Sequence, residues 1–219
     1  MPTATWERLP EARRAAVLRA AEEEFAAHGF SGGSLNVIAR NAGVAKGSLF
    51  QYFTDKIDLY THLSELACAR ISAHMGRHIA RMPWERGFFA AYRQLVLVWM
   101  EYFRTHPVEL ALTAAVNLEP EPSARLAVRE VVNRFYLRDL RPLLERAREA
   151  GDLRPDADLD ACLALLLMVL PHLALAPSYP GLDPVLGLSS GDPAQVEAAA
   201  MRLLDVFEAA FGTRVTAEP

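Results

Sequence analysis

The most informative stretch of the chain is residues 31–59, which read SGGSLNVIARNAGVAKGSLFQYFTDKIDL. Ser34 is a residue type that favours a helix N-cap. Apolar residues then recur at the three- and four-residue spacing of a short amphipathic helix, at Leu35, Ile38, Ala39 and Ala42. Gly43 can adopt the left-handed conformation that ends such a helix. This half of the stretch therefore predicts about two helical turns followed by a tight turn.

A second short helix is expected from about Ala45. Its apolar side chains should face inward, at Val44, Leu49 and Phe53. Its outward residues should be Lys46, Ser48, Gln51 and Tyr52. Side chains of these types bond phosphates and base edges in DNA complexes. Two short helices joined by a glycine turn are typical of a helix-turn-helix, so duplex DNA is the first partner to consider.

With these residues in place, the chain resembles the TetR family of transcriptional regulators. The resemblance rests on AGVAKGSLF over residues 42–50 and on flanking matches at Ile38-Ala39, Tyr52-Phe53, Lys56 and Leu59. The first helix of the family is matched by Ala20-Ala21, Phe25 and Gly29-Phe30. The similarity is strong over roughly residues 10–60, and elsewhere it rests on length and helical pattern alone.

Two departures from the family pattern concern the DNA contacts. Phe50 stands where the family most often has a tyrosine, so a phosphate bond from that hydroxyl is absent here. Leu35 and Asn36 make the start of the first motif helix less polar than is usual. The operator sequence therefore cannot be carried over from the family.

Every strong signal in the remaining chain is helical, so we expect an all-α fold. Helices are predicted over 10–28, 57–80, 84–105, 107–117, 123–150 and 158–175. A last helix follows the Pro/Gly-rich stretch 177–193 and ends at about residue 211. Pro107 can open one of these helices, and Asp158 another. The predicted organisation is an N-terminal three-helix DNA-binding domain over 1–56 and a C-terminal helical ligand-binding and dimerisation domain over 57–219.

Charge is distributed unevenly along a chain whose formal net charge is −4. Residues 1–56 hold seven Lys/Arg against six Asp/Glu, or +1, and residues 57–219 hold 16 against 21, or −5. The only lysines, Lys46 and Lys56, both lie in the predicted DNA-binding segment. A weakly basic head can still bind duplex if its cations face one way and two heads act together.

The sequence predicts a cytoplasmic protein. Its N-terminus lacks a signal pattern, and its longest apolar run, Ala161 to Leu170, is about half of a membrane span. Cys68 and Cys162 share no C-x-x-C pattern, which favours two reduced thiols over a disulfide or a metal site. The residues imply no cofactor.

The candidate DNA contacts divide into two groups. Base edges are assigned to Lys46, Ser48 and Gln51, with Gly47 allowing close approach of the backbone. Phosphates are assigned to Ser34, Tyr52 and Lys56, and Asn36 could serve either role. The alternative for Tyr52 is that it packs only against the first helix.

A ligand site is predicted in the C-terminal region, which is rich in aromatic and flexible apolar residues. Its candidates are Tyr92, Trp99, Phe103, Asn117, Tyr136, Met168 and His172. Pockets for apolar molecules combine such a lining with a few polar groups. The alternative is an ordinary core.

Arg134, Arg138 and Arg141 share one helix face, which is either a solvated salt-bridged surface or the rim of an anion site.

Two short patterns in the sequence resemble an enzyme motif and a metal-binding motif. Residues 187–191 fit the G-x-S-x-G of serine hydrolases, but the last histidine, His172, precedes them, which favours a linker. His74 and His78 have the spacing of a shared metal ion but lack a third ligand, which favours a wet helix face. We therefore expect neither a catalytic nor a metal site.

The predicted function is a ligand-responsive transcriptional regulator, a repressor that is released from a palindromic operator by a largely apolar molecule such as a fatty acid or acyl thioester. The resemblance implies a homodimer in which the last two long helices of each subunit pair. Two recognition helices related by a two-fold axis read half-sites about 34–36 Å apart. An activator with the same DNA contacts is the alternative, and an enzyme is a more remote one.

Overall fold

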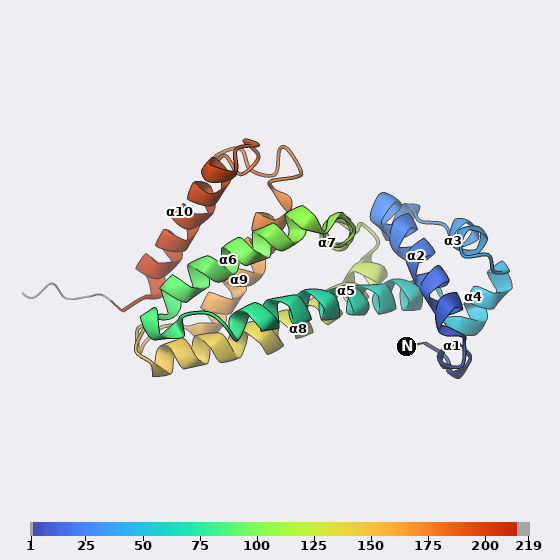
Figure 1. Ribbon diagram of the computed structural model, residues 1–219, viewed down its shortest axis with the longest axis horizontal. Helices are drawn as coiled ribbons and strands as arrows, with labels where there is room; N and C mark the ends of the chain where they lie inside the picture. The colour runs from blue at the N-terminus through green and yellow to red at the C-terminus, as the bar shows by residue number, and fades with distance from the viewer. Residues whose placement is uncertain (1, 214–219) are drawn as a thin grey trace, which may run out of the picture. The chain divides into compact units, whose positions relative to one another are not determined.

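The computed structural model describes residues 2–213, and its regular elements there are all helical, which confirms the all-α fold (Figure 1). The α-helices are α1 (Ala4–Glu7), α2 (Glu11–Gly32), α3 (Leu35–Asn41), α4 (Lys46–Tyr52), α5 (Lys56–Ile79), α6 (Phe88–Thr105), α7 (Pro107–Asn117), α8 (Pro122–Glu149), α9 (Leu159–Leu175) and α10 (Pro193–Phe211). A 3-10 turn, η1 (Trp84–Arg86), precedes α6. Among the described residues, no helix combines the length and the apolarity needed to cross a bilayer.

Packing divides the chain into two compact units. The first contains the residues up to Arg70 together with His106–Arg134, and the second contains Ile71–Thr105 together with the residues from Phe135 onward. Helices α5 and α8 contribute one part to each unit. The predicted functional boundary after residue 56 remains a prediction, because packing groups α7 and the start of α8 with the N-terminal helices.

The helix-turn-helix of the first unit forms where the sequence predicts it. Gly43 has a φ of +67°, the left-handed conformation that favours glycine, and it joins α3 to α4. The N–H of Val44 donates to the carbonyl of Ala39 at 3.0 Å, which closes the turn. Ile38 and Leu49 are buried in the shared core. Ser34 precedes α3 as expected, but its side chain makes no capping bond, and its N–H donates to Glu24 instead.

A one-turn helix that the sequence did not predict, α1, packs against the end of α4. Trp6 is only 3% exposed, and its ring lies 5.8 Å from Tyr52 and 4.8 Å from Phe53. The N–H of Thr3 donates to the carbonyl of Tyr52 at 2.9 Å, and the Thr3 hydroxyl donates to the carbonyl of Gln51. The unpaired carbonyls at the C-terminal end of α4 thus receive partners from the N-terminal segment.

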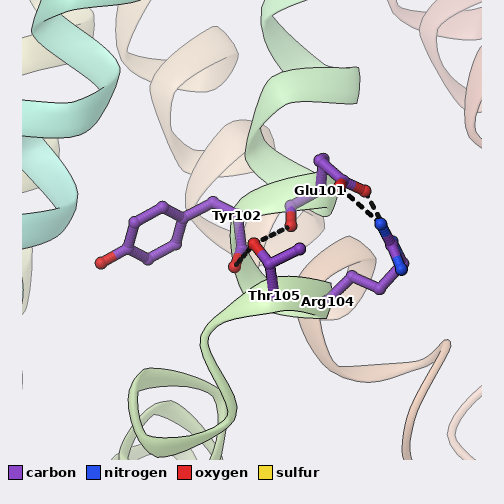
Figure 2. A network of polar contacts seen from close by, with 4 residues as sticks. All are labelled: Glu101, Tyr102, Arg104 and Thr105. Carbon is purple, nitrogen blue, oxygen red and sulfur yellow. Dashed lines mark hydrogen bonds and ion pairs between the residues drawn. The ribbon is translucent and has the colours of Figure 1, made fainter.

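The second unit has an aromatic core along α6. Tyr92, Trp99 and Phe103 are buried, and the indole N–H of Trp99 donates to the carbonyl of Leu170 in α9 at 2.9 Å. Figure 2 shows how α6 ends: the Thr105 hydroxyl donates to the carbonyls of Glu101 and Tyr102, at 2.9 and 3.2 Å. Pro107 then prevents the preceding residue from continuing the helix.

Candidate functional site

The exposed face of α4 is the candidate site for DNA. Lys46, Gly47 and Gln51 are exposed and Ser48 is partly buried, while Leu49 on the opposite face is buried. The helix therefore presents an ammonium group, an amide and a stretch of bare backbone on one side. A donor and acceptor set of this kind matches phosphates and base edges in the major groove.

Tyr52 does not belong to this exposed face, which corrects its expected outward position. Its side chain is 5% exposed and packs against Trp6. The periodicity of the helix-turn-helix predicts an outward side chain because a partner from outside this motif leaves no trace in it. The partner that buries it comes from α1, 46 residues earlier in the chain. The Tyr52 ring therefore has a packing role, against Trp6 of α1, and its phosphate contact stays a prediction.

The other candidate phosphate ligands flank the motif. Asn36 is exposed on the first turn of α3, and Ser34 is partly buried just before it. Lys56 begins α5, where its ammonium lies 4.5 Å from the centre of the Phe30 ring. Burial lowers the pKa of Lys56, and the carboxylates of Glu119 and Glu24 act in the opposite direction. The lysine is thus held at the edge of the core.

Glu119 is a buried acid that the sequence interpretation missed. It is 3% exposed, and it comes from the loop between α7 and α8. Its carboxylate accepts from the N–H of Phe30 at 3.1 Å, the hydroxyl of Ser31 at 2.6 Å and the N–H of Glu121 at 3.0 Å. Gly29, with a φ of +63°, interrupts the regular helix just before these donors. The composition of residues 119–122, Glu-Pro-Glu-Pro, is typical of a stiff loop, but it does not indicate this contact.

Four of the predicted ligand-site residues lie in the aromatic part of the second unit. Trp99 lies 4.8 Å from Phe103 and 5.9 Å from Tyr136, measured between ring centres. Tyr92 stacks on Phe88 at 5.3 Å. The Tyr92 hydroxyl is buried and has no hydrogen-bond partner among the described residues. Such a hydroxyl calls for an explanation, because nearly all buried polar groups are paired.

The remaining predicted ligand-site residues are placed differently. Met168 is 62% exposed on α9, which does not suit a residue that lines a closed apolar pocket. His172 is half-buried on the same helix. Asn117 belongs to the first unit, where it accepts from Arg129 at 3.1 Å and donates to the carbonyl of Thr113. An open cavity elsewhere in the second unit, of about 470 Å³, is lined by Arg148, Glu149, Gly151, Leu153, Pro155 and Thr213.

The three α8 arginines considered for an anion site, Arg134, Arg138 and Arg141, each contact an acidic side chain of this chain. Arg134 pairs with Glu65 and Arg141 with Asp160. Arg138 pairs with Asp139 and also donates to the Ser72 hydroxyl. This arrangement matches the salt-bridged surface better than the rim of an anion site.

The two patterns that resemble a metal motif and an enzyme motif, His74/His78 and residues 187–191, can also be placed in the structure. The rings of His74 and His78 lie 4.8 Å apart, and no group of three or more possible metal ligands occurs within residues 2–213. Residues 187–191 lie in the loop before α10, and the described part of the chain has no strand before them. The carboxylate of Asp183 holds this loop by accepting from the N–H groups of Leu186 and Leu188, at 2.8 and 2.7 Å.

Comparison with known proteins gives a consistent picture of the DNA-binding segment. Residues 17–63 match the family described as bacterial regulatory proteins, tetR family. The chain is 28% identical over 138 residues to the HTH-type transcriptional repressor BepR of Brucella suis, an alignment that spans 62% of this chain and only 57% of that protein. It is 27% identical over 146 residues to the fatty acid metabolism regulator protein of Bacillus subtilis, spanning 65% and 71% of the two chains.

Solved structures share the fold along nearly the whole chain. A TetR family transcriptional regulator from Chloroflexus aurantiacus is 25% identical with a TM-score of 0.65, and the match covers 98% of this chain and 100% of that one. The transcriptional regulator FadR from Bacillus subtilis, in complex with stearoyl-CoA, has a TM-score of 0.68 at 15% identity, with 90% and 98% covered. Residues 17–63 thus match the tetR family model, and the chain resembles TetR family transcriptional regulators in sequence and in fold.

Proposed function

We propose that the protein is a ligand-responsive repressor that binds a palindromic operator as a homodimer. The observation that carries the proposal is the exposed face of α4, which contains Lys46, Gly47 and Gln51. Leu49, on the opposite face, is buried in the core and fixes the helix there. In this proposal Lys46, Ser48 and Gln51 contact bases, and Gly47 lets the backbone approach. Ser34, Asn36 and Lys56 contact phosphates on either side. Tyr52 positions the helix from the core.

A mobility-shift experiment with the DNA that flanks the protein's own coding region tests this proposal. We expect a complex that survives a large excess of random duplex of the same length, because base contacts add to the phosphate term that all duplexes share. Affinity should also fall steeply as salt is raised. Equal competition by random duplex would contradict the proposal of a specific operator.

The proposed homodimer interface lies on α9 and α10. Leu165 and Met168 are exposed on α9, and Val206 is 69% exposed on α10. Apolar side chains gathered on two helices are typical of a surface that is covered by a partner. The exposure of Met168, which does not suit a pocket, is explained by this role.

The proposed effector is a largely apolar acid or its acyl thioester. Two observations support this class. Buried Trp99 and Phe103 form an aromatic set with partly buried Tyr136, and the buried hydroxyl of Tyr92, which has no partner among the described residues, could donate to a carbonyl or carboxylate. The relative named for fatty acid metabolism and the fold neighbour that holds stearoyl-CoA motivate the first compounds to try.

Release of the operator by stearoyl-CoA, stearic acid and free coenzyme A tests the effector class. We expect the first two to dissociate the complex and free coenzyme A to leave it intact, because only the first two carry an acyl chain. The Tyr92→Phe variant should need more effector while binding DNA as well as the wild type. Dissociation by free coenzyme A alone would contradict an apolar effector.

An activator would bind DNA in the same way as a repressor. Measuring transcription from the bound promoter distinguishes the two, because an activator raises it and a repressor lowers it.

A further inference from the structure

Phe50 is an apolar residue on the otherwise polar exposed face of α4. Its side chain is 49% exposed, whereas the neighbouring aromatics Tyr52 and Phe53 are 5% and 1% exposed. Phe50 is also absent from the apolar residues that pack against the core of this unit. The ring therefore does not serve the fold in the way that its neighbours do.

The position of Phe50 on the helix directs its ring toward the N-terminal half of α4. Side chains on a helix lean toward the N-terminus and cover the preceding turn. The residue one turn earlier is Gly47, where an added Cβ would meet no atom within 4 Å. The Phe50 ring thus stands beside open space at the start of the recognition helix, next to exposed Lys46. In helix-turn-helix proteins the N-terminal residues of this helix contact the base edges.

Among the groups on the floor of the major groove, one is apolar. Thymine carries a C5-methyl group there, and the other base edges present hydrogen-bond donors and acceptors. A phenylalanine ring cannot pair with those donors and acceptors, but it can exclude water from a methyl group. The chemistry of Phe50 therefore selects thymine.

We propose that Phe50 determines specificity by packing its ring on the C5-methyl group of one thymine in each half-site of the operator. The inference rests on the proposed function, because it requires α4 to lie in the major groove. It adds a base preference that the polar residues of the helix do not supply. The role differs from those of Lys46, Ser48 and Gln51, whose polar groups are proposed to bond the donors and acceptors of base edges.

The test replaces each thymine of the bound operator, one at a time, by deoxyuridine, which lacks only the methyl group. At one position per half-site we expect wild-type affinity to fall about fourfold, the factor that corresponds to roughly 0.8 kcal/mol for one buried methyl group. Substituting 5-bromodeoxyuridine at that position should restore the affinity, because bromine has nearly the size of a methyl group. The Phe50→Ala variant should bind the thymine and deoxyuridine operators equally well.

Controls separate the possible outcomes. Phe50→Leu keeps an apolar side chain and should retain part of the discrimination, and Gln51→Ala should retain all of it. Unchanged thermal unfolding of the Phe50 variants would show that they fold normally.

The proposal is overturned if no position distinguishes thymine from deoxyuridine in the wild type, or if Phe50→Ala keeps the discrimination. It is also overturned if Phe50→Ala weakens specific and random duplex equally, which would indicate a contact to the sugar-phosphate backbone. If the wild type binds no specific duplex, the proposed function itself fails before the scan begins.

Discussion

Gln51 is exposed on α4, and its amide can both donate and accept, which is the pattern that adenine requires in the major groove. We expect Gln51→Ala to weaken operator binding by about 1 to 3 kcal/mol and to relax selectivity at one base pair. Binding to random duplex should change little, because the phosphate contacts remain. Titrations of specific and random duplex measure both effects.

The matched control for this change is Gln94→Ala on α6, since Gln94 is also exposed but lies far from α4 in the sequence. The control should bind operator like the wild type. An equal loss on specific and random duplex for Gln51→Ala would mean that Gln51 contacts no base.

Asp183 shows a residue-scale effect that depends on pH. The backbone N–H groups of Leu186, Leu188 and Val185 donate to its carboxylate and lower the pKa of Asp183 to about 2. An unfolded aspartate has a pKa of about 3.9. The folded pKa is depressed, so the contribution of Asp183 to stability is present above about pH 4 and is lost as pH falls toward 2.

We therefore expect Asp183→Asn to lower the melting temperature at pH 6 and to differ less from the wild type as the pH approaches 2. Melting curves of both proteins between pH 6 and pH 2 provide the measurement. A gap that stays constant with pH would contradict a role for the charged carboxylate.

At the scale of elements, α1 holds the end of the recognition helix. Its Trp6 fills the space against Tyr52 and Phe53, and Thr3 bonds to the last carbonyls of α4. We expect Trp6→Ala to destabilise the protein by about 3 to 5 kcal/mol, as is usual for a large buried aromatic, and Trp6→Phe to cost less. Denaturant unfolding measures these differences.

The milder change Thr3→Ala separates positioning from stability, since Thr3 lies at the start of α1 rather than in the core. It should reduce operator affinity while the unfolding midpoint moves little. If Thr3→Ala left DNA affinity unchanged, α1 would be only a cover for the core.

The loop between α7 and α8 provides a second link between elements. Glu119 bonds to the end of α2, 88 and 89 positions away in the sequence. Removing its carboxylate leaves the N–H of Phe30 and the hydroxyl of Ser31 without this acceptor, so we expect Glu119→Ala to cost about 1 to 3 kcal/mol of stability. Glu85→Ala, at an exposed position of η1, is the control and should cost far less. Equal unfolding midpoints for the two variants would contradict the importance of this contact.

At the scale of the whole molecule, the main question is assembly. We expect the full-length protein to sediment as a dimer at micromolar concentration and Met168→Glu to shift it toward monomer, because a charge would be buried in the proposed interface. The matched control is Leu126→Glu at a 73% exposed position of α8, outside α9 and α10, and it should remain dimeric. A Met168→Glu protein that stays fully dimeric would move the interface away from this face.

The full chain is the right material for this experiment. A fragment that begins near residue 58 would lack α2, against which α7 packs within the first unit. Its exposed apolar surface could associate for reasons unrelated to the native interface. Single substitutions on the intact protein avoid this problem.

The sequence alone predicted the longer helices and the resemblance of this chain to the TetR family. Helix boundaries depend on local features: Gly43 ends α3, Pro107 begins α7, and Asp158 caps α9 by accepting from the N–H groups of Asp160 and Ala161. The periodicity of Ile38 and Leu49 also fixed which faces of α3 and α4 are buried. These features involve residues within a turn or two of each other, so they can be read along the chain.

The tertiary structure alone decided which side chains meet across long stretches of sequence. Tyr52 is buried because Trp6 covers it, Glu119 is buried because it reaches the end of α2, and Met168 is exposed because α9 turns its other face to Trp99. Helical periodicity shows that a residue lies on an apolar face, but it does not show which element packs against that face. That depends on how all the helices fill space together, and no local pattern in the sequence records it.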